Sequence, residues 1–138
     1  MERKRAAQQF VEVIPHAREL GMQVVEVGEG RAAIAMPYDP KLIGDPETGV
    51  ISGGAVSALM DTCCGAAVLT HPGARGATAT IDLRIDYMRP ARPGQTIIAR
   101  AVCHHMTRSV AFVRATAEDD TADPPVATAT GAFTVGEG

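Results

Sequence analysis

The stretch that decides the fold runs Ser52-Gly-Gly-Ala-Val-Ser-Ala-Leu-Met-Asp-Thr-Cys-Cys-Gly-Ala-Ala-Val-Leu69. Its residues are apolar or small nearly all round a helix, which is typical of a helix buried in a protein core. Asp61 is the one charged residue in it, and a carboxylate there must be hydrogen-bonded, paired or protonated. Gly53 and Gly54 leave accessible backbone N–H groups at the helix start, which favour a developing negative charge. The stretch predicts a buried helix with an anion-binding end and a single acid.

Length and composition indicate one globular domain over residues 1–138, in which residues 1–20 form an N-terminal helical segment. A net charge of −3 and an aromatic content of 4% argue against nucleic acid or an anionic membrane surface as a partner. No apolar segment follows the charged N-terminus, and no run reaches the ~18 apolar residues of a membrane span. Three cysteines, two of them adjacent, favour a reducing cytoplasm over a disulfide framework. Because no zinc-ligand spacing surrounds them, we expect no metal.

The remaining chain reads as strands joined by short connections, after a helical pattern near residues 3–13. We expect a hairpin, an irregular loop over residues 38–51 and then, beyond the central helix, four more strands. The strands are expected at 22–27, 31–36, 78–87, 95–104, 110–118 and 126–135. In 78–87 the odd positions are apolar and the even positions polar, so one face should meet the core. Short connections favour antiparallel pairing, which predicts an α+β fold: an antiparallel sheet of about six strands wrapped around one long helix.

Five motifs fall in order along the chain: Gly44-Asp-Pro46, Gly49-Val-Ile-Ser-Gly-Gly54, Leu59-Met-Asp-Thr62, Thr80-Ile-Asp-Leu83 and Tyr87-Met-Arg-Pro90. Together they resemble the hot-dog-fold acyl-CoA thioesterases of the phenylacetate-degradation (PaaI-like) type. The resemblance runs from about residue 20 to residue 135. It implies hydrolysis of an acyl-CoA thioester without metal or cofactor, with CoA present only as part of the substrate.

The resemblance also implies roles for individual residues. The N–H of Gly53 would polarise the thioester carbonyl, and Asp61 would act as general base for water or as nucleophile. The hydroxyl of Thr80 would help to orient the water. Without the resemblance, Asp61 also reads as a buried acid that bonds its neighbours, and Thr80 as an ordinary strand residue. The glycine pair likewise fits close backbone packing.

The chain departs from the family pattern at two positions. Relatives usually carry His before the glycine pair, where this chain has Ser52, and many carry Asn in the preceding loop, where it has Asp45. An Asp there accepts hydrogen bonds but cannot donate an amide proton. We expect Ser52, Gly54 and Asp45 to bind substrate. Ser57, one turn before Asp61, is a further candidate for lining the site, although a small residue there also suits helix packing.

Two arginines are candidates for contacts to the phosphates of CoA. Arg89 and Arg108 lie at strand ends and turns, where a guanidinium can reach a phosphate. Exposed turn arginines also occur without a specific role, so this alternative stays open.

Helix geometry predicts that the site is shared between two chains. Gly53 and Asp61 are eight residues apart, which is ~12 Å along a helix axis. One carbonyl carbon cannot meet both groups of the same helix, so we expect a homodimer with two helices side by side. The resemblance implies that such dimers pair into tetramers. The alternatives are a non-catalytic acyl-CoA-binding protein and a hot-dog hydratase or dehydratase, although no His is expected in or beside the central helix.

Overall fold

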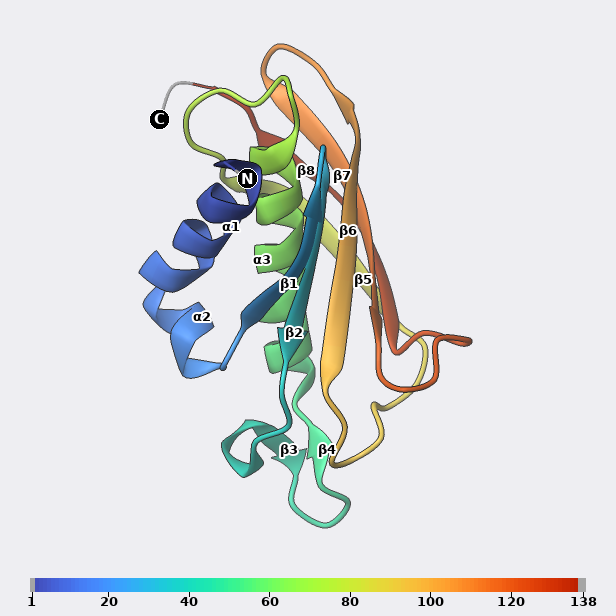
Figure 1. Cartoon of the computed structure of the whole chain (residues 1–138). Coiled ribbons are helices and arrows are strands. Elements are labelled where there is room, and N and C mark those ends of the chain that lie inside the picture. The colour runs from blue at the N-terminus through green and yellow to red at the C-terminus, as the bar shows by residue number, and fades with distance from the viewer. Residues whose placement is uncertain (1, 137–138) are drawn as a thin grey trace.

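The computed structural model describes residues 2–136, which form a six-stranded sheet, a two-stranded sheet and a layer of helices (Figure 1). The helices are α1 (Glu2–Val13), α2 (Pro15–Glu19) and the long α3 (Gly53–Thr70), with a short 3-10 turn, η1, at Pro40–Leu42. The strands are β1 (Gln23–Gly28), β2 (Arg31–Met36), β3 (Ile43–Asp45), β4 (Val50–Ile51), β5 (Thr80–Tyr87), β6 (Ile97–Met106), β7 (Val110–Glu118) and β8 (Ala127–Thr134).

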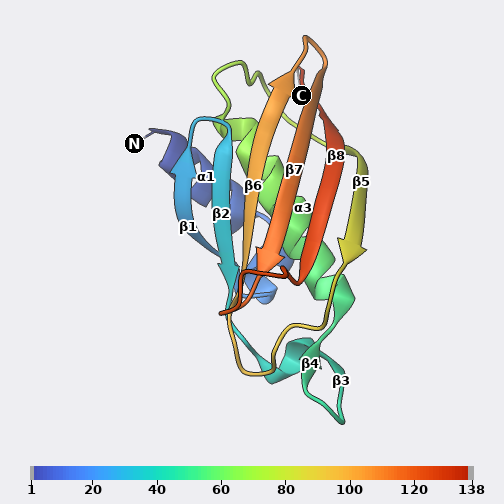
Figure 2. The same cartoon turned by 90° about the vertical axis from the view of Figure 1, so that its right-hand side faces the viewer.

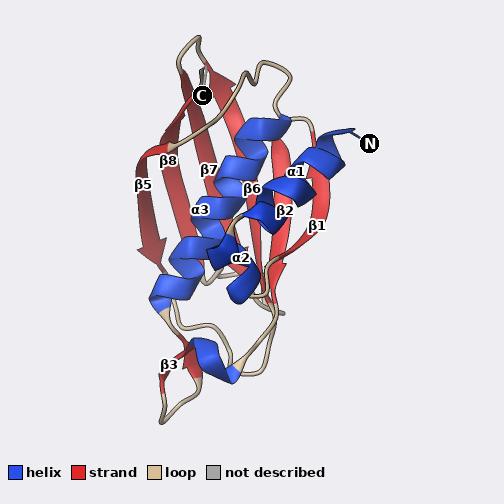
Figure 3. Ribbon diagram, turned by 90° about the vertical axis from the view of Figure 1, so that its left-hand side faces the viewer, coloured by secondary structure: helices blue, strands red, loops and turns tan. Residues whose placement is uncertain are grey.

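The main sheet has six strands in the order β1-β2-β6-β7-β8-β5, and every neighbouring pair is antiparallel (Figure 2). It wraps around α3, and α1 and α2 lie on the same side of the sheet (Figure 3). β1 and β5 are the two edges. The predicted α+β architecture of six strands around one long helix is therefore confirmed.

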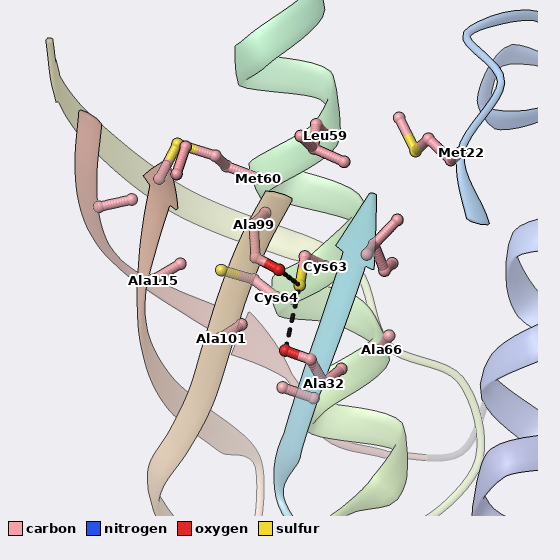
Figure 4. Close-up of a cluster of buried hydrophobic side chains, with 14 of the residues drawn as sticks. Met22, Ala32, Leu59, Met60, Cys63, Cys64, Ala66, Ala99, Ala101 and Ala115 are labelled. Atoms are coloured by element: carbon pink, nitrogen blue, oxygen red, sulfur yellow. Dashed lines mark hydrogen bonds between the residues drawn. The ribbon is translucent and has the colours of Figure 1, made fainter. Parts of the chain in front are cut away.

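One face of α3 forms the centre of the core (Figure 4). Leu59, Met60, Cys63 and Cys64 are fully buried against the sheet. The Cys63 thiol donates to the carbonyl of Ala32 at 3.4 Å and to the carbonyl of Ala99 in β6 at 3.3 Å. Burial raises the pKa of this thiol to about 12. These thiols are core residues that stay protonated at neutral pH, since the reactive form of cysteine is the thiolate. With 18 residues and a mean hydropathy of 1.3, α3 is long and apolar enough to cross a membrane, but 61% of it is buried inside the protein.

The prediction that α3 is buried all round is wrong along one stripe. Ser57, Ala58, Asp61 and Thr62 are only half-buried, because the sheet covers one side of the helix and α1 covers only part of the other. α1 packs close at Gly65, where an added Cβ would lie 3.1 Å from the Phe10 ring. The open stripe is therefore a surface of the single chain that carries the one acid of the helix.

A β-bulge breaks the strict alternation predicted for residues 78–87. Between Thr80 and Asp82 the register of β5 against β8 shifts by one residue, so Ile81 is extra and 55% exposed. Beyond the bulge the prediction holds, and Leu83 packs against the core. Before the bulge the faces are exchanged, so Thr80, assigned to the polar outer face, points toward α3. Bulges often re-aim a side chain next to a functional site.

The loop predicted over residues 38–51 contains more regular structure than expected. It holds η1 and the β3–β4 hairpin, because its turn residues permit elements of two or three residues. Asp39 caps η1 by accepting from the N–H of Lys41 at 3.0 Å. The Tyr38 hydroxyl donates to the carbonyl of Gly49 at 2.7 Å, and Gly49 has a φ of 80°, which favours glycine. This segment delivers the chain to the start of α3.

Candidate active site

Asp61 lies in the open stripe of α3 and has one hydrogen-bond partner among the described residues. The Thr80 hydroxyl donates to its Oδ1 at 2.7 Å. The bulge in β5 makes this contact possible by turning Thr80 toward the helix. A carboxylate held by one donor keeps lone pairs that can accept a proton from a water molecule. The structure thus brings together two of the three residues predicted to be catalytic.

The carboxylate opens into a hollow of about 320 Å³ between α1, α2, α3 and β5. The lining combines small helix residues with aromatic and aliphatic side chains: Phe10, Ile14, His16, Ala58, Asp61, Thr62, Gly65, Thr78, Ala79, Thr80 and Phe133. Five of the eleven lining residues are polar, so the hollow combines apolar walls with hydrogen-bonding groups, as small-molecule sites do. This surrounding suits an acyl group next to the acid.

His16 corrects the expectation that no His lies beside α3. It comes from α2 and lines the hollow of Asp61 and also a second hollow at the start of α3. It lies far from Asp61 in the sequence, in a short helix that begins at Pro15. No spacing signal in the sequence connects the two residues, so only the packing of α2 against α3 reveals it.

At the N-terminus of α3, Ser52 is the N-cap. Its hydroxyl accepts from the N–H of Gly54 at 3.2 Å, which is the ordinary use of a serine at this position. The N–H of Gly53 has no acceptor among residues 2–136, and Gly53 is exposed. Of the predicted glycine pair, only Gly53 therefore presents an open donor, while the N–H of Gly54 is used by the cap.

Tyr87, at the end of β5, lies against the same helix start. Its hydroxyl donates to the carbonyl of Gly53 at 2.7 Å and lies 2.5 Å from the hydroxyl of Ser57. Because the tyrosine proton points to Gly53, Ser57 is the donor in the second bond. The hydroxyl of Ser57, a predicted lining residue, is therefore occupied by Tyr87. Tyr87 belongs to a motif that carried the family resemblance, but no role was predicted for it.

Two further hollows flank this helix start. One, of about 340 Å³, is lined by His16, Leu20, Lys41, Leu42, Ile43, Ser52, Gly54 and Ala55. The other, of about 370 Å³, is lined by Val50, Ile51, Gly53, Tyr87, Met88, Arg89 and Pro90. Asp61 lines neither of them. Within one chain the open N–H of Gly53 and the carboxylate of Asp61 thus lie in separate hollows, in line with their separation along the helix.

The guanidinium of Arg89 is fully used within the fold. It holds Asp119 through Nη1 at 2.8 Å and Nη2 at 2.6 Å. Its remaining N–H groups donate to the carbonyls of Pro90, Thr121 and Pro124. An arginine has five such donors, so none is left for a phosphate. The expectation that Arg89 binds CoA through its N–H groups has no support in this arrangement, although its side chain lines the hollow beside Gly53.

Arg108 and Asp45 lie away from these hollows. Arg108 is exposed in the β6–β7 turn, at the opposite end of the molecule from the β3–β4 hairpin (Figure 1), and its carbonyl accepts from Arg75 at 2.6 Å. Asp45 shapes the tip of that hairpin, since its carboxylate accepts from the N–H of Glu47 and the hydroxyl of Thr48. Within the described part of the chain, no group of three or more His, Cys, Asp and Glu side chains could hold a metal ion.

Comparison with known proteins adds independent findings. The pattern of the Thioesterase superfamily matches residues 48–124. A Halobacterium salinarum protein whose name proposes an esterase is 37% identical over 123 residues, covering 84% of this chain and 81% of that protein. The medium/long-chain acyl-CoA thioesterase YigI of Escherichia coli is 27% identical over 124 residues, covering 80% and 79%. A solved mutant of the phenylacetic acid degradation protein PaaI from Thermus thermophilus is 29% identical with a TM-score of 0.76, covering 88% and 98%. The predicted hot-dog fold is confirmed.

Proposed function

Since the chain belongs to the thioesterase superfamily, we propose that it hydrolyses an acyl-CoA thioester to a carboxylic acid and CoA at a site completed by a second copy of the chain. That it is a thioester hydrolase of the PaaI-like type follows from its family and relatives. The acyl-CoA substrate of the YigI relative supports the choice of thioester. The observation that carries the proposed mechanism is the carboxylate of Asp61, held by Thr80 at 2.7 Å and open to a hollow with mixed apolar and polar walls.

In the proposed reaction, the thioester carbonyl accepts a hydrogen bond from the N–H of Gly53. A positively polarised helix start stabilises the negative charge that develops on that oxygen. Water held by Asp61 and Thr80 attacks the carbonyl carbon while Asp61 takes its proton. The tetrahedral intermediate then collapses, the carbon–sulfur bond breaks, and the proton on Asp61 passes to the leaving CoA sulfur.

Direct attack by Asp61 is the alternative route. Its carboxylate would displace the CoA thiolate and form an anhydride with the acyl group, which water then hydrolyses. The two routes differ in which molecule, the protein or the acid product, receives the oxygen atom of water. In a single turnover in ¹⁸O-labelled water, direct attack followed by water addition at the Asp61 carbonyl leaves the label in the protein, whereas general-base catalysis places it in the acid product.

Two surfaces of the single chain support a shared site. The edge strand β5 exposes Ile81 and Tyr87, which are 55% and 49% accessible, and Met88 next to it is 50% accessible. The stripe of α3 around Asp61 is half-open beside this edge. Unpaired edges with apolar side chains favour pairing with another strand. A two-fold contact along β5 would place two copies of α3 antiparallel, with Asp61 of one near Gly53 of the other.

The higher assembly and the location of the protein are also proposals. The family resemblance implies that two such dimers pair into a tetramer, with acyl-CoA as the small-molecule partner and no resident cofactor. The cysteine content favours a location in the cytoplasm. Size-exclusion chromatography with light scattering tests the assembly. A stable monomer at micromolar concentration would contradict the shared site.

A panel of acyl-CoA thioesters tests the activity. We expect the wild type to release CoA from at least one chain length or aryl acyl group, detected with a thiol reagent. Asp61→Asn should lose turnover, whereas Asp39→Asn, a matched change of the carboxylate that caps η1, should retain it. Binding of acyl-CoA without turnover would instead identify the non-catalytic acyl-CoA-binding protein.

His16 favours a second candidate function, a hot-dog hydratase or dehydratase. A His beside an acid can move a proton to or from a carbon next to the thioester carbonyl, and His16 lines the same hollow as Asp61. Assays with enoyl-CoA and 3-hydroxyacyl-CoA substrates separate the two reactions. Water addition lost in His16→Gln, with no thiol release in the wild type, would establish this candidate in place of the thioesterase.

A further inference from the structure

The peptide group that joins Gly53 to Gly54 is held from both sides. Its carbonyl, on Gly53, accepts from the hydroxyl of Tyr87 at 2.7 Å. Its N–H, on Gly54, donates to the hydroxyl of Ser52 at 3.2 Å. The Tyr87 hydroxyl is in turn fixed by Ser57, one turn further along α3. Every polar atom of this peptide group is therefore engaged by a side chain.

Holding this peptide group matters because it joins two consecutive glycines. Glycine has more conformational freedom than any other residue, and the first turn of a helix lacks hydrogen bonds from its own N–H groups. An unrestrained Gly53-Gly54 pair would let the helix start fluctuate. The open N–H belongs to the preceding peptide group, whose Ser52 carbonyl accepts from the N–H groups of Ala55 and Val56 at 3.1 and 3.3 Å. The two peptide groups share the Cα of Gly53, so fixing the second one limits how far that N–H can turn.

We propose that Tyr87 is a positioning residue for the thioesterase reaction, an inference that rests on the proposed function. Its hydroxyl fixes the Gly53 carbonyl and so aims the Gly53 N–H at the thioester oxygen. Ser57 keeps the Tyr87 hydroxyl in place, and Ser52 secures the other side of the same peptide group. Together they orient the helix start in a chain that has Ser52 where the resemblance led us to expect His.

The placement of Tyr87 agrees with this role and not with packing alone. In the single chain Tyr87 is 49% accessible, and its hydroxyl makes the hydrogen bonds that join it to α3. Its ring lies 3.7 to 3.8 Å from the position that a Cβ on Gly53 would take. The same residue lines the hollow that contains Gly53. The hydroxyl is thus the part of Tyr87 that acts on the site.

Tyr87→Phe removes that hydroxyl and keeps the ring. We expect kcat to fall about tenfold with little change in KM, because a misdirected donor costs transition-state stabilisation more than substrate binding. Tyr38→Phe is the matched control, since its hydroxyl also donates to a glycine carbonyl at 2.7 Å but at Gly49, outside the site. Unchanged kcat in Tyr87→Phe, or an equal loss in both variants, would overturn the inference.

A double-mutant cycle shows whether Tyr87 acts through the Gly53 N–H. Gly53→Pro removes that N–H at the first helical position, where proline is favoured. The backbone of Ser52, with ψ of 136°, already has the conformation required before a proline. If Tyr87 acts by aiming this N–H, Tyr87→Phe has no further effect on kcat in the Gly53→Pro background. Fully multiplicative effects would contradict the proposal.

Amide hydrogen exchange separates failure of this inference from failure of the proposed function. In Tyr87→Phe, the N–H of Gly54 should exchange faster than in the wild type or in Tyr38→Phe, whether or not any thioester is hydrolysed. Wild-type inactivity on every thioester would reject the thioesterase reaction alone. Unchanged protection of Gly54 would reject the positioning role of Tyr87 alone.

Discussion

Two carboxylates of this chain, Asp61 and Asp119, lie in contrasting surroundings. The Asp119 side chain is fully buried, and its oxygens accept from Arg89 and from the N–H groups of Arg92 and Thr121. These donors, led by the Arg89 hydrogen bonds, hold the pKa of Asp119 well below its usual range. Asp61 instead has a single partner among the described residues, Thr80, and faces a hollow.

The difference separates a carboxylate that holds the fold from one that is available for chemistry. Asp119 ties the turn after β5 to the loop after β7, and each of its lone pairs is directed at a donor. Asp61 keeps accepting capacity that no residue in the range 2–136 uses. A partly solvated carboxylate with lone pairs that accept no hydrogen bond can take a proton during a reaction. A buried carboxylate whose lone pairs all accept hydrogen bonds cannot do so without breaking those contacts.

The largest expected effect is on activity. Asp61→Asn should lower kcat/KM by about 10²- to 10⁴-fold, the range of a general base, because the amide cannot take a proton from water. The thermal unfolding midpoint should stay close to that of the wild type, since Asp61 has only one hydrogen bond to lose. Steady-state kinetics and calorimetry on the same samples check both parts. A large loss of stability would place Asp61 with Asp119 as a structural acid.

The next effect is on stability. Asp119→Asn should lower the free energy of unfolding by about 3 to 5 kcal/mol, because it leaves the partly buried Arg89 guanidinium without its charge partner. Urea unfolding measures this. Turnover per folded molecule should stay within a few-fold of wild type, since Asp119 lines none of the hollows around α3. A loss below about 1 kcal/mol would show that the pair contributes no more than a surface ion pair.

The pH dependence of stability follows from the lowered pKa of Asp119. A depressed carboxyl pKa contributes stability that is present above the unfolded value of ~3.9 and is lost as pH falls toward the folded value. Below about pH 4 the free energy of unfolding should therefore fall more steeply in the wild type than in Asp119→Asn. Urea unfolding at a series of pH values between 2 and 5 provides the comparison. Parallel pH profiles would refute the contribution of this carboxylate.

The smallest expected effect concerns the single partner of Asp61. Thr80→Val keeps the shape of the side chain but removes the hydroxyl, and we expect kcat to fall about tenfold, in line with the loss of one hydrogen bond to a charged group. Thr80→Ser, which restores a hydroxyl, should recover most of the loss. A valine variant as active as the wild type would remove Thr80 from the site.

Much of the fold was predictable because its signals are local. The central helix lies where the stretch of small and apolar residues predicts it, with the glycine pair at its start and His71-Pro72-Gly73 directly after its end. The face of the sheet on which Thr80 lies could not be predicted from the alternation of polar and apolar residues, because the bulge in β5 depends on pairing with β8. The sequence also directed attention to Arg89 as a phosphate ligand, although its partner Asp119 is a long-range contact that no local pattern reveals. The positions of His16 and Tyr87 beside α3 are tertiary contacts of the same kind.

The candidate site was predictable as residue types but not as a complete arrangement. The acid and the open N–H were both identified from one stretch of sequence, and their spacing already implied that one chain cannot join them. The position of the second copy is a property of the assembly, so no pattern within one chain reveals it.

Mixed dimers test the shared site most directly. Asp61→Asn and Gly53→Pro chains, carrying different tags, are co-expressed and the heterodimer is purified. If Asp61 and Gly53 of different chains form each site, the heterodimer contains one intact site and should recover about half of the wild-type activity, although each parent homodimer is nearly inactive. A heterodimer as inactive as its parents would contradict the shared site.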